Sequence, residues 1–147
     1  MKTFFTLLFA IITLSLLSAC ATPSQIMADA EVRELCEKDG GIKVYETVKL
    51  PVERFTKQGS IYIPDKSMSK KGDEYYYKSS THYLKKGYTD LYRIHTKLYR
   101  ALDNKLLGEI ITYSRRGGDV PGPWHASSFR CPQITDNDLN KQVFIKE

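Results

Sequence analysis

The spacing of apolar and polar residues predicts one helix near the start of the chain. Between residues 24 and 39 apolar side chains recur at helical spacing, with Val32 and Cys36 on one stripe and charged residues opposite. Gly40 and Gly41 follow directly, and glycine commonly ends a helix. The sequence therefore predicts an N-terminal helix that buries Cys36 in its last turn.

Downstream of this helix, alternation with period two predicts strands. The long alternating segments are residues 42–50, 74–83, 92–102 and 106–114. Shorter extended pieces are expected at residues 61–63 and 143–145. The predicted fold class is α+β, with one N-terminal helix packed on an antiparallel, meandering β-sheet.

A turn signal at residues 103–105 separates the last two long strands. A three-residue loop there places Leu98 opposite Ile110 and keeps the apolar face together. A two-residue loop would set Leu98 against Glu109, so we prefer the three-residue loop.

The segment 115–132 is rich in glycine and proline and has no period. We expect an ordered loop that is pinned at its far end by Cys131. The tail then contains an expected turn around Asp136 and Asp138 before the last short strand.

The first 19 residues have the form of a secretory signal peptide. A short positive start that contains Lys2 precedes an apolar run from Phe4 to Leu17. This run is shorter than the roughly 20 residues of a transmembrane helix, and it ends in small residues. An uncleaved anchor helix is the alternative, but no basic stop-transfer cluster follows.

The stretch Leu17-Ser18-Ala19-Cys20 resembles the lipobox of bacterial lipoproteins. The resemblance implies that Cys20 carries a diacylglycerol, and that the signal is removed just before it. The new amino group is commonly acylated as well, and two or three acyl chains hold a protein stably on a membrane. An ordinary signal peptide in which a cysteine happens to stand here is the alternative.

The resemblance also bears on localisation. Ala21 follows the cysteine, and the absence of aspartate at this position resembles the outer-membrane class of Gram-negative lipoproteins. We therefore expect a lipid-anchored protein of the cell envelope, on the periplasmic face of the outer membrane if the host is Gram-negative.

The expected organisation is a signal peptide at 1–19, a lipidated tether at 20–25 and a single small α+β domain at 26–147. Removing 19 of the 147 residues leaves 128 and takes away only Lys2, so the formal net charge falls from +5 to +4. This small net positive charge is typical of an ordinary solvated protein surface. Attraction to anionic lipid, lipopolysaccharide or cell-wall polymer is the alternative. No nucleic-acid-binding pattern accompanies it.

Two cysteines remain in the expected mature chain, Cys36 and Cys131. An exported protein meets oxidising conditions, so the pair predicts a disulfide. Two buried free thiols are the alternative. A zinc site is disfavoured because there is no CxxC pair and the histidines do not cluster. We expect no cofactor.

Catalytic chemistry has little support in the sequence. His82 and His95 fall on polar strand faces, where they are most simply half-exposed. Asp119, His125 and Ser127 could be drawn as a hydrolytic trio, but residues this close in sequence rarely reach the required geometry. No nucleophile elbow is present, and we assign no catalytic residue.

Binding is the better use of segment 115–132. Trp124, Arg115, Arg116 and His125 form the candidate binding loop, because Trp and Arg most often anchor interfaces. Trp124 could instead plug the sheet edge beside Cys131. The tyrosine-rich strand faces have two possible roles, as part of the core or as an aromatic platform for a glycan or protein. The tyrosines concerned are Tyr75, Tyr76, Tyr77 and Tyr83.

The expected function is a non-enzymatic binding or accessory module facing the periplasm. Its partners would be the membrane, through lipid on Cys20, and an envelope protein or glycan. One alternative is an exclusion lipoprotein of the phage type, or an inhibitor of a lytic enzyme. A second alternative is a cell-wall or lipid hydrolase.

Overall fold

The computed structural model describes residues 21–122 and 125–147. The predicted signal peptide at 1–19 and the lipidation site Cys20 lie outside the described residues. The elements follow in the order α2 (Pro23–Asp39), β1 (Gly41–Val44), β2 (Val48–Leu50), η1 (Val52–Arg54), β3 (Tyr75–Lys85), β4 (Thr89–Arg100), β5 (Lys105–Gly117), β6 (Ser128–Cys131), α3 (Asp136–Val143) and β7 (Phe144–Lys146).

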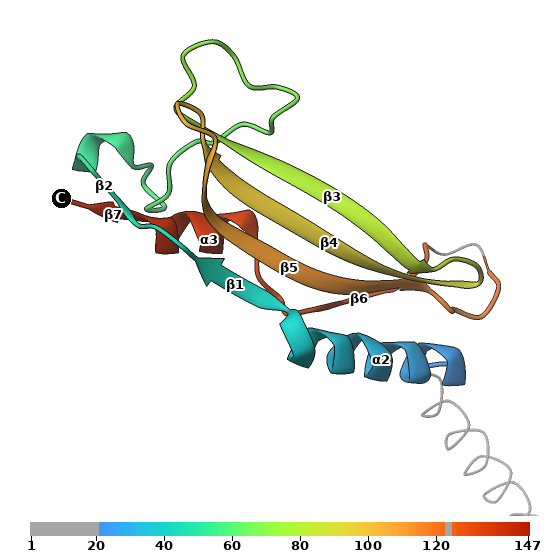
Figure 1. Ribbon diagram of the computed structural model, residues 1–147. Coiled ribbons are helices and arrows are strands. Elements are labelled where there is room, and N and C mark those ends of the chain that lie inside the picture. The colour runs from blue at the N-terminus through green and yellow to red at the C-terminus, as the bar shows by residue number, and fades with distance from the viewer. Residues whose placement is uncertain (1–20, 123–124) are drawn as a thin grey trace, which may run out of the picture.

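The predicted α+β class is confirmed (Figure 1). The main sheet has the order β1-β5-β4-β3, and the three long strands form an antiparallel meander. β1 and β6 both pair with β5, along Gly108–Ile111 and Tyr113–Arg116 respectively, on the edge that β4 leaves open. β2 and β7 form a separate parallel pair, which the sequence did not predict.

The N-terminal helix is confirmed and begins slightly earlier than expected. Thr22 caps α2 in a capping box with Gln25, and Pro23 opens the first turn. Residues 23–25, predicted as the end of the tether, are therefore helical. At the other end Gly40 is required by space, because a Cβ there would lie 2.6 Å from the Cys36 carbonyl oxygen.

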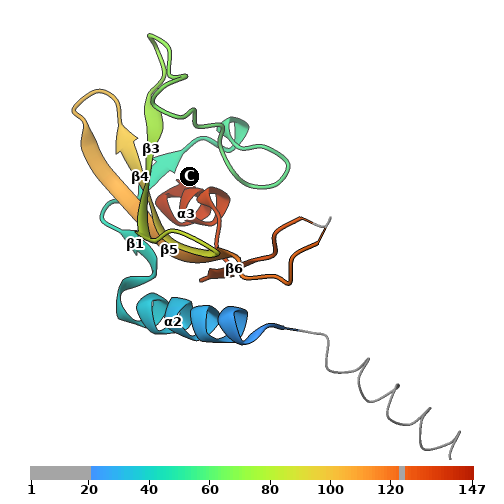
Figure 2. The ribbon, with the colours of Figure 1, turned by 90° about the vertical axis from the view of Figure 1, so that its right-hand side faces the viewer.

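The two helices cover opposite faces of the sheet (Figure 2). Val32 and Cys36 of α2 pack with Ile111, whereas Leu139 of α3 packs with Ile110. Because Ile110 and Ile111 are neighbours on one strand, their side chains point to opposite faces. The protein therefore has two hydrophobic clusters, one on each side of the sheet.

The predicted disulfide is confirmed. Cys36 and Cys131 are joined across 95 residues of sequence, with their Cα atoms 5.8 Å apart. The bond ties the last turn of α2 to the end of β6.

The predicted hairpin register is wrong by two residues. Leu98 lies opposite Gly108, not Ile110, and the loop between the strands has four residues. After Leu98 the register shifts by one further residue, so that Tyr99 lies opposite Leu106. The side chain of Leu139 would come within 2.9 Å of a Cβ at residue 108, so only glycine leaves room for α3 here. Because side chains alternate with period two, a register shift of two residues leaves each side chain on the face of the sheet that was predicted for it.

Three further predictions are corrected. The single strand expected at 42–50 is broken, because the N–H groups of Tyr45 and Glu46 both turn to the Leu107 carbonyl. The tail forms the helix α3, opened by a capping box of Thr135 and Asp138, where a turn was expected. Residues 61–63 form no strand.

The expected loop at 115–132 is also shorter than predicted. β5 continues to Gly117 and β6 occupies Ser128–Cys131, so both ends of the expected loop are strands. β6 pairs with the last part of β5. The disulfide therefore pins a strand to α2, and not the end of a loop.

Candidate functional site

Arg115, which was chosen as a binding residue, is a buried structural residue. It lies on β5 with 4% of its surface exposed. Its Nε donates a 2.6 Å hydrogen bond to Asp29 on α2, and its Nη1 donates to the Ser127 hydroxyl at 2.7 Å. The guanidinium is thus fully engaged within the fold, and it holds the segment after β5 against the helix.

Three polar side chains complete this network. The Gln25 amide donates to Asp119 at 2.7 Å and to the Ser127 hydroxyl at 2.8 Å. The backbone N–H of Ser127 donates to the other oxygen of Asp119 at 2.7 Å. That backbone hydrogen bond holds the pKa of Asp119 below its usual value. The network anchors the segment between β5 and β6 on the first turn of α2.

The other members of the candidate loop are placed differently. Arg116 is exposed on the opposite face of β5 from Arg115, and His125 is exposed in the segment before β6. Trp124 lies outside the described residues, so both of its expected roles stay predictions. Arg115 and Arg116 lie on opposite faces of β5, so the candidate residues that the structure describes do not form one binding surface.

The considered hydrolytic trio is not assembled in the structure. The Ser127 hydroxyl accepts hydrogen bonds from Arg115 and Gln25, which are donors and cannot take its proton. Asp119 binds the Ser127 backbone. In residues 21–122 and 125–147, no hydrogen bond joins His125 to either residue.

A cluster that sequence reasoning missed lies on the face of the sheet that also carries α2. His95 on β4 contacts Glu109 on β5 through Nε2 and Oε2 at 2.6 Å, and the Tyr45 hydroxyl donates to the other Glu109 oxygen at 2.6 Å. The Glu109 side chain is 11% exposed. Burial raises the pKa of Glu109, but the bonds from Tyr45 and His95 outweigh burial and leave it lowered. We interpret this cluster as a stabilising network.

The tyrosines on β3 serve mainly as core residues. Tyr76 and Tyr77 are buried, and Tyr75 packs edge-on against Phe144 with ring centroids 4.7 Å apart. Burial raises the pKa of Tyr77. Only Tyr83 presents an exposed ring, so β3 does not form a continuous aromatic platform.

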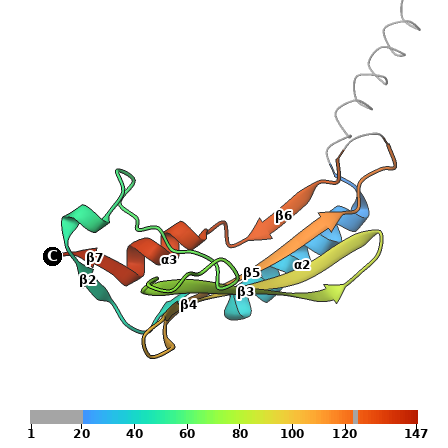
Figure 3. The same ribbon diagram turned by 90° about the horizontal axis from the view of Figure 1, so that it is seen from above.

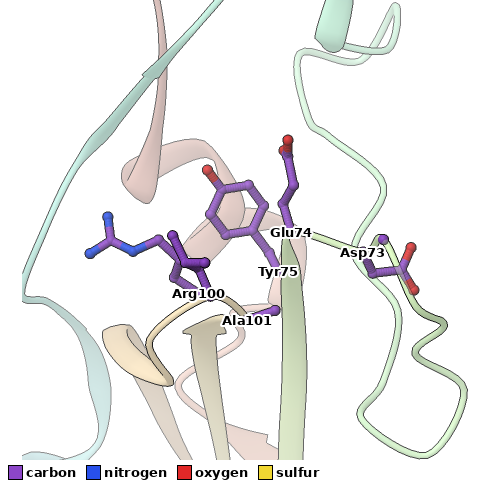
Figure 4. Close-up of a pocket in the computed structure, with 7 residues that line it drawn as sticks. Asp73, Glu74, Tyr75, Arg100 and Ala101 are labelled. Carbon is purple, nitrogen blue, oxygen red and sulfur yellow. The ribbon is translucent and has the colours of Figure 1, made fainter.

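A hollow lies at the end of the sheet farthest from the start of α2. It has a volume of about 490 Å³. We call it the distal pocket, and it is lined by Gly72, Asp73, Glu74, Tyr75, Arg100, Ala101 and Leu102. Figure 4 shows Glu74 and Tyr75 at the start of β3 and Arg100 and Ala101 where β4 ends. A concave site of this size suits a ligand or a partner side chain.

The walls of the distal pocket are held by ion pairs. Arg100 pairs with Glu46 at 2.8 Å and with Asp103 at 3.1 Å, and Arg54 pairs with Glu74 at 2.6 Å. The charged groups of Arg100 and Glu74 are therefore paired with other residues of the fold. Leu102, by contrast, is 92% exposed at the rim. The pocket thus combines a fixed wall with an exposed apolar side chain.

A smaller hollow of about 260 Å³ lies on the face that carries α3. Its floor includes Ile94 and Ile110, with the hydroxyls of Ser79 and Thr96 hydrogen-bonded to each other at 3.1 Å. This bond uses one of the two O–H donors, and both hydroxyls belong to the polar lining of the hollow.

Neither a metal centre nor a membrane-spanning helix is found in the part of the chain that the structure describes. Comparison with protein-family models, curated proteins and solved structures finds no match for this chain.

Proposed function

We propose that the protein is a lipid-anchored envelope protein that binds a partner protein through the distal pocket. The lipobox supports the anchor at Cys20. The pocket supports binding because concave hollows of this size are where proteins take up ligands or partner side chains, and Leu102 stands exposed at its rim.

The observation that carries the proposal is that the start of α2 and the distal pocket lie at opposite ends of the sheet. Thr22, two residues after Cys20, donates a hydrogen bond from its hydroxyl to the Gly118 carbonyl, just past the end of β5. The distal pocket begins at Arg100, at the far end of β4. The 12 residues of β4 span about 35–40 Å. With a lipid anchor just before α2, this length would hold the distal pocket away from the membrane.

The proposed setting is the periplasmic face of the outer membrane in a Gram-negative host. An inhibitor of a lytic enzyme, or an exclusion protein, would use the same pocket on a different partner. A hydrolase has less support, because Ser127 is surrounded by hydrogen-bond donors and lacks a base.

Site-specific photo-crosslinking in intact cells tests the proposal. A photoreactive residue at Leu102 reports on the distal pocket, and one at Lys78, exposed on β3, serves as the control. We expect a discrete crosslinked envelope protein at position 102 and none at 78. The same products at both positions, or none at either, would count against binding at the pocket.

Labelled peptidoglycan incubated with the purified wild type and with His125→Ala tests the hydrolase alternative.

A further inference from the structure

Three separate segments meet at the end of the molecule where α2 begins (Figure 3). They are the first turn of α2, the turn between β3 and β4, and the segment that follows β5. Gly118 joins all three, because its N–H donates to the Tyr88 carbonyl at 2.9 Å and its carbonyl accepts from the Thr22 hydroxyl at 2.5 Å. The Tyr88 hydroxyl also donates to the Asp119 carbonyl. These hydrogen bonds hold the three segments together at this end of the molecule.

These three segments and the strand end beside them carry several exposed apolar side chains. Met27 is 74% exposed and Tyr88 is 60% exposed. We call the whole set the anchor-end surface, and it consists of Ile26, Met27, Tyr83, Leu84, Tyr88 and Val120. Single exposed apolar residues are normal, but a group drawn from three segments at one end indicates a contact surface.

The charges near the anchor-end surface favour a membrane interface as its partner. Three carboxylates near this surface have partners within the fold. Asp29 pairs with Arg115, Glu31 pairs with Lys85, and Asp119 accepts a hydrogen bond from Gln25. Lys86 lies over the Tyr83 ring at 4.4 Å. Tyrosines and lysines beside aliphatic side chains are the combination found at the boundary between lipid and water.

We propose that the anchor-end surface docks on the headgroup region of the bilayer that holds the acyl chains of Cys20. This inference rests on the proposed lipid anchor. Pro23 is the third residue after Cys20, so the start of α2 lies within about 11 Å of the lipidated residue. Such a short tether keeps the surface at high effective concentration, so weak contacts suffice for docking. Docking would fix the orientation of the domain and point the distal pocket away from the membrane.

Depth-dependent fluorescence quenching tests the docking. The lipidated mature protein is placed in vesicles of phosphatidylethanolamine and phosphatidylglycerol, with and without brominated acyl chains. Every variant carries Trp124→Phe, so that one introduced tryptophan reports. Met27→Trp probes the anchor-end surface and Leu102→Trp is the matched control at the far end. We expect at least two-fold quenching for Met27→Trp and no change for Leu102→Trp.

Equal emission of Met27→Trp in plain and brominated vesicles would overturn the docking. Leu84→Trp is a second reporter from another segment, for which we expect the same quenching. Flotation of the same vesicles separates the two proposals. Protein that floats without quenching refutes docking alone, whereas protein that fails to float refutes the lipid anchor and the docking with it.

Discussion

Arg115 and Asp29 form an ion pair at 2.6 Å that joins β5 to α2, between residues 86 positions apart in the sequence. The Arg115 side chain is 5% exposed and that of Asp29 is 21% exposed. An ion pair this sheltered is costly to break from one side only, because the remaining charge loses its partner without regaining full hydration.

We therefore expect Arg115→Ala to destabilise the fold by about 3 kcal/mol. Arg116→Ala, one residue along on the exposed face, should change the free energy of unfolding by less than about 0.5 kcal/mol. Urea unfolding of the two variants gives the comparison. Equal effects would show that Arg115 does not hold α2 to the sheet.

The disulfide should account for a large share of the stability. A crosslink between Cys36 and Cys131 restrains a loop of 95 residues, which corresponds to about 4–5 kcal/mol by loop-closure entropy. We expect the double variant Cys36→Ser and Cys131→Ser to unfold at much lower urea. Wild type in reductant is the control, and its midpoint should fall to match. A midpoint that reductant leaves unchanged would contradict this expectation.

The lowered pKa of Glu109 predicts an acid-dependent loss of stability. The usual value for glutamate is 4.5, and hydrogen bonds in the fold hold the carboxyl below it. Its contribution is therefore present above pH 4.5 and is lost as the pH falls through the folded-state pKa. Unfolding free energies measured from pH 6 to 3 should decline less steeply for Glu109→Gln than for wild type. Glu37→Gln, on the exposed side of α2, should leave the slope unchanged.

Gly108 should tolerate no side chain, because α3 lies directly on it. A Cβ there would come within 2.9 Å of Leu139 and 3.0 Å of the Lys43 carbonyl oxygen. Overpacking of this kind costs about 1–3 kcal/mol. We expect Gly108→Ala to lower the melting temperature clearly. A double variant with Leu139→Ala that loses less stability than the two single variants added together would identify α3 as the cause. An unchanged melting temperature for Gly108→Ala would refute the close packing.

Local pattern was enough to predict the N-terminal helix and the faces of the long strands. Val32 and Cys36 are buried, as their spacing indicates. Leu98 and Ile110 lie on the same face of the sheet, as predicted, although they are not paired with each other. The disulfide followed from the number of cysteines and the expected export.

The missed features depend on contacts between distant segments. α3 is only eight residues long, and its Asp-rich start has the composition of a turn as much as that of a helix cap. The hairpin register depends on Leu139 meeting Gly108, which cannot be deduced before α3 is known. Arg115 looked like a free donor because its partner Asp29 lies in another element, and Glu109 gained its partners only when β1, β4 and β5 came together.

The lipid anchor at Cys20 is the claim on which the proposed function and the membrane docking both depend. Intact-mass spectrometry of the protein extracted from the membrane fraction tests it most directly. We expect a chain that begins at Cys20, heavier than residues 20–147 by a diacylglycerol and one further acyl chain, and a Cys20→Ala variant that lacks this modification. A chain of unmodified mass, or one that still carries residues 1–19, would contradict the anchor.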